Sequence, residues 1–118
     1  MRDSRGEIKI YTILKNHKVN FLEEYSFPDL TSAYGNELRF DFAVFDKNGN
    51  LDFLIEYQGE QHYSPVSKFG GKKGFKRQRK NDVLKRKYCL KNNIRLVSIP
   101  YFDEGKITYE YIMKAAGH

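Results

Sequence analysis

The chain has little of what disulfide-bonded, zinc-binding and membrane proteins need. Its 118 residues include one cysteine, Cys89, and no tryptophan. A single cysteine excludes an internal disulfide and a cysteine-based zinc cluster, so we expect a reducing, cytoplasmic setting. No apolar run approaches the length of a transmembrane helix, so no membrane partner is expected. The charged start, MRDSRGEIK, leads into no apolar segment, so no signal peptide is predicted.

The sequence also lacks internal repeats, low-complexity tracts and any linker that would divide it. Its length suits one domain, residues 1–118. Hydrophobic residues make up 40% and aromatic residues 15% of the chain, which is enough to fill a core. We therefore expect a single globular domain.

Acidic residues are nearly absent from the segment 66–91. Asp82 is the one acid there among eleven lysines and arginines, whereas the whole chain has a net charge of only +6. The rest of the chain is net acidic, so the positive charge is concentrated in one segment. Such polarity favours a polyanionic partner. The alternative is a solvated basic helix that only keeps the protein soluble.

The stretch 39–62, RFDFAVFDKNGNLDFLIEYQGEQH, predicts two strands joined by a turn at Asn48-Gly49. Folding the ribbon about that dipeptide sets Asp41 opposite Glu56. Side chains on a strand alternate between its two faces. One face is then predicted to carry Asp41, Ala43, Leu54, Glu56 and Gln58, and the other, apolar face Phe40, Phe42, Val44, Phe53, Ile55 and Tyr57.

Two carboxylates on opposing strands need a positive partner. Like charges directly opposite each other destabilise a sheet, and carboxylates are rarely buried unless they are paired or bound to metal. Hard divalent cations choose carboxylate oxygens. We therefore predict a divalent metal site at Asp41 and Glu56.

The predicted element order is αβββαβα, which defines an α/β fold with a mixed four-stranded sheet flanked by helices. Pro28 is expected to end the first strand, and residues 59–74 are expected to be irregular. The basic helix should pack through Val83, Leu84, Tyr88 and Leu90. The predicted elements are a helix at 4–16, strands at 19–27, 39–45 and 51–57, a helix at 75–92, a strand at 95–99 and a helix at 108–116.

This order of elements and acids resembles the PD-(D/E)XK nuclease superfamily. Glu7, Asp41 and the run Glu56-Tyr57-Gln58 stand at its motif positions. Pro28-Asp29 matches the letters "PD" but is interpreted as a decoy, because it is predicted to lie in a loop without a cross-strand relation to Glu56. The resemblance covers roughly residues 7 to 101.

The sequence departs from the superfamily at Gln58, where the motif lysine is expected. A neutral amide cannot act as a cationic stabiliser or a base. The chain resembles more closely the EDxHD branch, which includes very-short-patch repair endonucleases and some phage homing endonucleases. In that branch a histidine after the third strand and an aspartate on the next helix complete the site. His62 and Asp82 match those positions.

The resemblance implies a role for each residue in metal-dependent phosphodiester hydrolysis. Asp41 would be the main ligand of Mg²⁺ or Mn²⁺, and Glu56 would add its carboxylate or its backbone carbonyl. His62 would deprotonate the attacking water, and Asp82 would hold the histidine tautomer or share metal-bound waters. Two further residues would act on the periphery: Glu7 would orient outer waters, and Gln58 would bind a water or a phosphate oxygen.

Each of these residues also has a purely structural interpretation. Glu7 forms a capping box with Ser4. In this interpretation Asp41 and Glu56 would pair with surface arginines, and His62 would be an ordinary loop histidine. Asp82 would relieve repulsion within the basic helix, where Lys85 and Arg86 stand at helical spacing.

From these observations we predict a metal-dependent DNA endonuclease domain, of homing type, from a phage or its bacterial host cell. Double-stranded DNA is the expected partner, with a homodimer or a fused DNA-recognition domain supplying selectivity. Two alternatives are a non-catalytic nucleic-acid-binding module with a degenerate nuclease fold and a junction-resolving nuclease. The predicted DNA-binding residues are Lys72, Lys73, Lys76, Arg77, Arg79 and Lys80.

Overall fold

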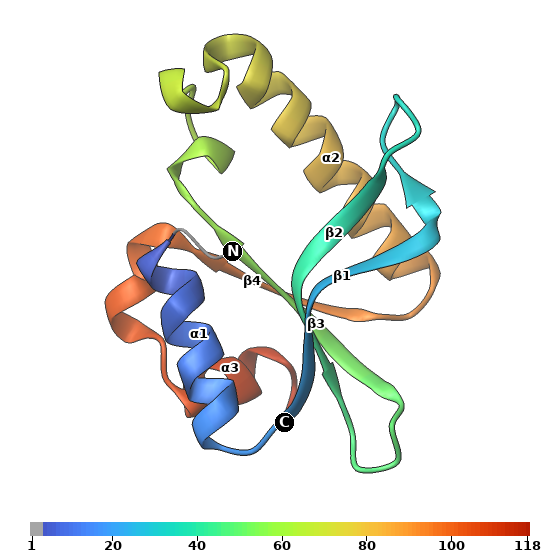
Figure 1. Ribbon diagram of the computed structural model, residues 1–118, viewed down its shortest axis with the longest axis vertical. Coiled ribbons are helices and arrows are strands. Elements are labelled where there is room, and N and C mark those ends of the chain that lie inside the picture. Colours follow the sequence, from blue (N-terminus) through green and yellow to red (C-terminus); the bar gives the residue numbers. More distant parts are fainter. Residues whose placement is uncertain (1–3) are drawn as a thin grey trace.

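The protein is described by a computed structural model that covers residues 4–118. Figure 1 shows a central sheet with α1 and α3 together on one side and α2 on the other. The predicted αβββαβα order is confirmed, with three short 3-10 helices added. The elements are α1 (Arg5–Asn16), β1 (Asn20–Thr31), β2 (Glu37–Phe45), β3 (Leu51–Gln58), η1 (Glu60–His62), η2 (Ser67–Phe69), α2 (Gly71–Lys91), β4 (Arg95–Pro100), η3 (Tyr101–Lys106) and α3 (Tyr109–Ala115).

The four strands lie in the order β1-β2-β3-β4. β1 and β2 are antiparallel, as are β2 and β3, whereas β4 runs parallel to β3. The parallel pair needs a crossover, and α2 supplies it. The mixed sheet is therefore the predicted one, and it sets the carboxyl ends of β3 and β4 side by side.

The central hairpin keeps the predicted register over most of its length. Phe42 pairs with Ile55, and Val44 pairs with Phe53. The turn is closed by Asp46, whose carboxylate accepts hydrogen bonds from two backbone N–H groups of the turn at 2.9 and 3.0 Å. Of the two residues Asn48 and Gly49, Gly49 alone has a positive φ, 83°. Asn48 therefore does not use the left-handed conformation that the Asn-Gly signal allows.

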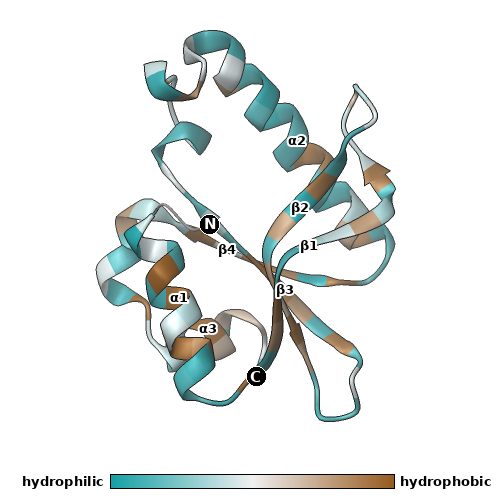
Figure 2. Ribbon diagram, viewed as in Figure 1, coloured by the Kyte–Doolittle hydropathy of each residue, from teal (hydrophilic) through white to brown (hydrophobic). Residues whose placement is uncertain are grey.

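Two hydrophobic clusters hold the helices to the sheet. The first joins α1, α3 and the sheet, and it includes Ile10, Leu14, Phe42, Phe53, Ile55, Val97 and Ile112. The second lies under α2 and includes Leu30, Leu38, Phe40, Ala43, Leu54 and Cys89. Figure 2 shows hydrophobic colour concentrated in the strands, while α2 is mostly hydrophilic.

Several predicted boundaries are wrong. β1 continues through Pro28 to Thr31, so Pro28-Asp29 lies in a strand and not in a loop. Proline is tolerated there because β1 is an edge strand, where a missing N–H costs no ladder bond. The segment 59–74 is not wholly irregular, since it holds η1, η2 and the first turn of α2. Gly70, with φ 90°, allows the chain to turn into α2 ahead of the predicted start.

The predicted packing face of α2 is largely wrong. Leu90 is 82% exposed, and Val83 and Leu84 are also exposed. The buried helical positions are instead Gly74, Asp82, Lys85 and Cys89. A charged pair of side chains on the inner face of a helix is unusual, and it is explained by partners on β3 and η1.

Phe40 also differs from its prediction. It packs in the cluster under α2, whereas Phe42 packs in the cluster with α1. The expected alternation is therefore broken at Asp41, between them. This break frees the Asp41 side chain to bond the backbone of the neighbouring strand.

Candidate active site

Glu56 and Lys85 form a buried ion pair between β3 and α2. Lys85 Nζ donates to Glu56 Oε2 at 3.1 Å, and both side chains are at most 10% exposed. The ammonium also lies 5.3 Å from the centre of the Phe40 ring. Burial raises the pKa of Glu56 to about 6, although Lys85 opposes this by favouring the charged carboxylate. The prediction that a positive group neutralises this carboxylate holds, but the group present is a lysine.

Asp41 is held against the end of β3. The backbone N–H of Tyr57 donates to Asp41 Oδ2 at 2.6 Å. The last paired residues of the β2–β3 ladder are Phe42 and Ile55. Two residues further along β3, the Asp41 carboxylate takes the place of a backbone acceptor for the Tyr57 N–H. Burial, and then the nearby negative charges of Glu56 and Glu7, raise the pKa of Asp41 to about 8. Without added cations, the fold therefore favours the protonated form of Asp41.

Glu7 forms the predicted capping box, while its predicted role in orienting waters around a metal stays a prediction. The Ser4 hydroxyl accepts from the Glu7 N–H and donates to its carboxylate, each at 3.1 Å, which is the predicted cap of α1. Its charge also contributes to the raised pKa of Asp41, so the cap stands beside the carboxyl pair. Gly6 permits this approach, because a Cβ at Gly6 would overlap the Tyr57 ring.

His62 and Asp82 form a second buried pair next to the first. His62 Nδ1 lies 2.9 Å from Asp82 Oδ2, with side-chain exposures of 8% and 11%. The other oxygen, Asp82 Oδ1, accepts from Gln78 Nε2 at 3.1 Å. Asp82 contributes to the raised pKa of Glu56, which links the two pairs. Asp82 therefore does not pair with Lys85 or Arg86 along the helix, and His62 is not an unpartnered loop residue.

The two pairs leave one histidine nitrogen for chemistry. A carboxylate acts only as an acceptor, so the Nδ1 of a neutral His62 carries the proton and donates to Asp82. Nε2 is then the unprotonated nitrogen that can accept a proton from water. Gln58 is turned elsewhere, since its amide oxygen accepts from the Tyr63 hydroxyl at 2.9 Å.

The donor set suits magnesium better than a metal that needs a protein cage. Among residues 4–118, no group of three or more His, Cys, Asp or Glu side chains could hold a metal ion. Magnesium keeps several waters and is commonly held by one or two carboxylates together with substrate phosphates. Asp41 and Glu56 supply two hard oxygen donors from neighbouring strands. These residues fit a divalent cation.

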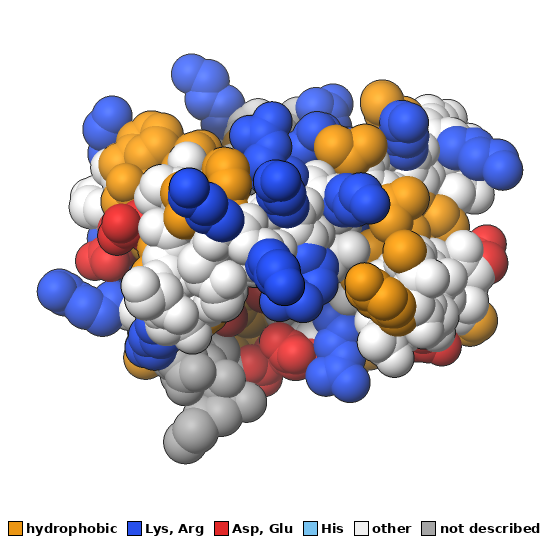
Figure 3. Space-filling view, turned by 90° about the horizontal axis from the view of Figure 1, so that it is seen from above, with side chains coloured by type: hydrophobic (Ala, Val, Ile, Leu, Met, Phe, Trp, Pro, Cys, Tyr) orange, Lys and Arg blue, Asp and Glu red, His pale blue; other side chains and the backbone are white. Residues whose placement is uncertain are grey.

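The outer face of α2 is basic and free of acidic partners. The six predicted DNA-binding residues are all exposed, and no ion pair within the described part of the chain involves them. Figure 3 shows lysine and arginine side chains spread over this end of the molecule, with acidic side chains at its border. Lys85 is the exception in the basic segment, because it points inward. A groove of about 350 Å³ adjoins the His62–Asp82 pair and is lined by Gln61, Phe69, Gly74, Arg77, Gln78 and Asn81.

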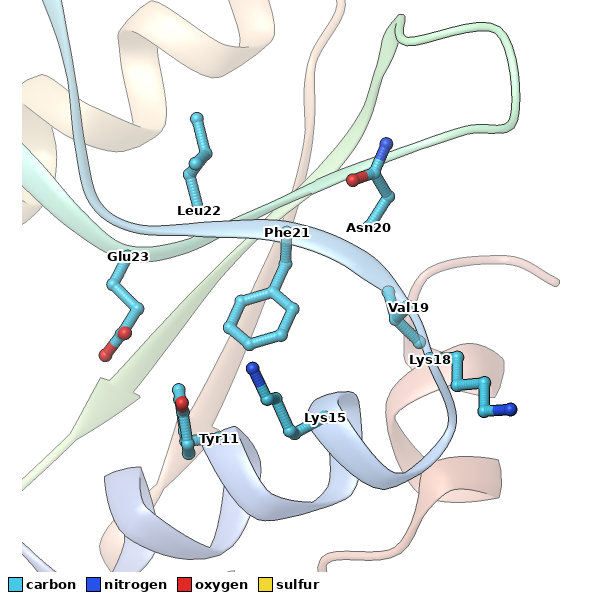
Figure 4. Close-up of a pocket in the computed structure, with 8 residues that line it drawn as sticks. All are labelled: Tyr11, Lys15, Lys18, Val19, Asn20, Phe21, Leu22 and Glu23. Atoms are coloured by element: carbon cyan, nitrogen blue, oxygen red, sulfur yellow. The ribbon is translucent and has the colours of Figure 1, made fainter.

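A larger hollow, of about 560 Å³, lies between α1 and the start of β1 (Figure 4). Tyr11, Lys15, Phe21 and Glu23 are among its lining residues, and none of the predicted site residues is. Size alone does not make this hollow the active site. The clustered titratable groups lie elsewhere, between β3 and α2.

Lys85 is the site residue that sequence reasoning missed. Lys85 belongs to the basic segment, and the predicted packing face of the helix, which consists of apolar residues, leaves Lys85 on the solvent side. One signal was present: Asp82, Lys85 and Cys89 are spaced by three and four residues, which places them on one helical face. The single acid and the single cysteine of the segment mark the buried side.

Comparison with known proteins finds viral relatives. The chain is 44% identical over 54 residues to uncharacterized protein 094L of Frog virus 3 (isolate Goorha), covering 44% of this chain and 35% of that protein. It is 35% identical over 92 residues to uncharacterized protein 307L of Invertebrate iridescent virus 6, covering 64% and 47%. It is 30% identical over 106 residues to uncharacterized protein 033L of Invertebrate iridescent virus 3, covering 84% and 50%.

The chain thus spans about a third to a half of the length of these curated relatives. No protein-family model matches it. No solved structure matches it. Within residues 4–118, no helix is both long and apolar enough to cross a bilayer.

Proposed function

We propose that this chain is the catalytic domain of a metal-dependent DNA endonuclease of the PD-(D/E)XK kind that acts in the cytoplasm of an infected cell. One observation carries the proposal: two buried polar pairs, Glu56–Lys85 and His62–Asp82, stand together beside Asp41 at the border of an exposed basic helix. A protein that needs only a stable core has little use for four buried ionisable groups at one place. A metal-dependent phosphodiesterase can use these groups as metal ligands, as a general base and as a cation near the phosphate.

The chain's own residues would divide the work of hydrolysis. Asp41 and Glu56 would hold Mg²⁺ or Mn²⁺, which when bound neutralises phosphate charge and acidifies water. His62 Nε2 would accept the proton of the attacking water, with Asp82 fixing the ring and the tautomer. Lys85 would hold Glu56 in place and add a positive charge beside the bound phosphate.

The basic helix would bring the substrate to these groups. Lys72, Lys73, Lys76, Arg77, Arg79 and Lys80 are exposed along α2, whose inner face carries Asp82 and Lys85. Contacts with phosphates give affinity and orientation without reading sequence. The homing-type assignment, a fused recognition domain and a homodimer stay predictions on this basis.

A second candidate is a nucleic-acid-binding module without catalysis. It is favoured by the Glu56–Lys85 contact, because a carboxylate already neutralised by lysine has less need of a metal. The two candidates are separated by incubating the protein with supercoiled plasmid, with and without Mg²⁺ or Mn²⁺. Metal-dependent nicking supports the enzyme, and retention of plasmid without nicking supports the binder.

A further inference from the structure

Three exposed aromatic rings lie together beside the candidate active site. Tyr63, Tyr101 and Phe102 are 44%, 38% and 66% exposed. Every pair among them is in ring contact, with centroids 5.5 to 5.7 Å apart. Exposed apolar groups that gather in a patch mark an interaction site more often than scattered ones do. We refer to these three residues as the aromatic patch.

The patch is tied to the site by the backbone and by a hydrogen bond. Gln58 pairs with Pro100 across the parallel strands, and Tyr101 follows Pro100 directly. Glu56 is two residues before Gln58, which corresponds to about 7 Å along a strand. The Tyr63 hydroxyl donates to Gln58 Oε1, so one ring of the patch is fixed to a predicted site residue. Tyr63 directly follows His62, so the His62–Asp82 pair is also close to the patch.

The acids next to Phe102 in sequence, Asp103 and Glu104, each have a partner. Asp103 accepts from the Tyr111 hydroxyl at 2.7 Å and lies 3.7 Å from Lys106. Glu104 lies 3.8 Å from Arg5. These pairs weaken the field that would otherwise repel a phosphate chain, while α2 supplies unpaired positive charge on the other side of the site.

We propose that the aromatic patch stacks an unpaired base of the DNA strand that enters the site. The inference rests on the proposed function and specifies its substrate class: DNA with an unpaired nucleotide next to the cleaved bond, at a gap, a flap or a branch. Aromatic rings stack on any base, whereas bases inside an intact duplex are not available to a surface ring. The charge of α2 selects a polyanion, and the exposed rings select one with free bases.

Binding can be measured without cleavage by adding EDTA. The probes are a fluorescein-labelled duplex with a short gap and a labelled intact duplex of the same length. The dissociation constant for each is measured by fluorescence anisotropy at fixed salt. The parent should bind the gapped DNA more tightly. Phe102→Leu should weaken gapped binding by about 5- to 100-fold, the range expected for one base–aromatic stack, and leave duplex binding nearly unchanged.

Matched variants separate stacking from apolar contact and from misfolding. Phe102→Tyr keeps an aromatic face and should retain the parent's preference, whereas leucine keeps only the bulk. Tyr34→Ala removes an aromatic ring that is 83% exposed and outside the patch, and it should change nothing. Because Phe102 is mostly exposed, its replacement should not unfold the protein.

A second measurement locates the contact directly. A 5-iodouracil placed at the unpaired position should crosslink under ultraviolet light to Tyr63, Tyr101 or Phe102, as read by mass spectrometry of the peptides. Equal gapped-DNA affinity of Phe102→Leu and the parent, or crosslinks confined to other residues, would overturn the stacking proposal alone. A parent protein that binds neither probe would overturn the proposed function and this inference with it.

Discussion

Lys85 Nζ lies 3.1 Å from Glu56 Oε2, and both side chains are buried. Buried ion pairs add little net stability compared with apolar residues, but removing one partner strands a charge. We expect Lys85→Met to reduce the free energy of unfolding by about 3 kcal/mol or more at pH 7. The double variant with Glu56→Gln should recover part of that loss. The measurement is urea unfolding.

The control for this pair is Lys87→Met, two residues along on the exposed side of α2. It should change the free energy of unfolding by no more than about 0.5 kcal/mol. Equal effects of the two methionine variants would mean that Lys85 does not neutralise a buried carboxylate.

The acid pair predicts an unusual dependence of stability on pH. Burial and like charge raise the folded-state pKa of Asp41 from 3.8 to about 8 and that of Glu56 from 4.5 to about 6. Between those values the folded state binds more protons than the unfolded state, so stability falls as pH rises from about 4 to about 8. Asp41→Asn should remove most of this slope, because asparagine cannot ionise. The fold should be kept, because the amide oxygen of asparagine can still accept from the Tyr57 N–H.

Urea unfolding of the parent and Asp41→Asn from pH 5 to 8.5, without divalent ions, tests this expectation. The variant should be the more stable protein at pH 8.5, by at least about 1.4 kcal/mol, the equivalent of one pKa unit. Parallel stability profiles for the two proteins would show that the folded-state pKa of Asp41 is close to its usual value.

His62 and Gln58 separate the EDxHD branch from the wider superfamily. His62→Ala removes the proposed base and should slow single-turnover cleavage by at least about 100-fold, with metal affinity little changed. Gln58→Ala should lose much less, since its amide is engaged with Tyr63. Rates across pH 5.5 to 9 at saturating Mg²⁺ provide the test. If Gln58→Ala is the slower enzyme, position 58 and not His62 is at the centre of the chemistry.

The basic face of α2 is tested by salt. Changing Lys72, Lys73, Lys76 and Lys80 to glutamine should lower the slope of log K against log salt by up to about 0.9 per lost duplex contact. Lys47→Gln and Lys114→Gln, exposed on the hairpin turn and on α3, are the controls and should leave the slope intact. An unaltered slope in the α2 variant would move the DNA surface elsewhere.

Local signals in the sequence were sufficient for most of the fold. Asn48-Gly49 fixed the hairpin register, and Ser4 with Glu7 marked the start of α1. The failures have a physical cause in common, which is tertiary context. The edge position of β1 made Pro28 tolerable within a strand.

The same holds for the site. His62 and Asp82 were predicted from motif order, and the structure brings them together. The helical spacing of Asp82, Lys85 and Cys89 places them on one face of α2. The burial of Lys85 could still not be predicted, because it depends on Glu56 across the sheet–helix interface. Phe40 could not be placed by strict alternation, because the alternation is broken at Asp41, whose side chain accepts from the Tyr57 backbone N–H.

The central claim is metal-dependent cleavage at Asp41, and plasmid nicking tests it most directly. Supercoiled plasmid is incubated with the parent, Asp41→Asn and Asp29→Asn, each with Mg²⁺ and with EDTA. Asp29 is the matched control, because it stands in the literal "PD" pair and its carboxylate accepts from the Tyr88 hydroxyl at 2.7 Å. We predict nicking by the parent and Asp29→Asn in Mg²⁺ alone, and none by Asp41→Asn. Nicking by Asp41→Asn at the parent's rate, or no nicking by a folded parent in Mg²⁺, would contradict the account.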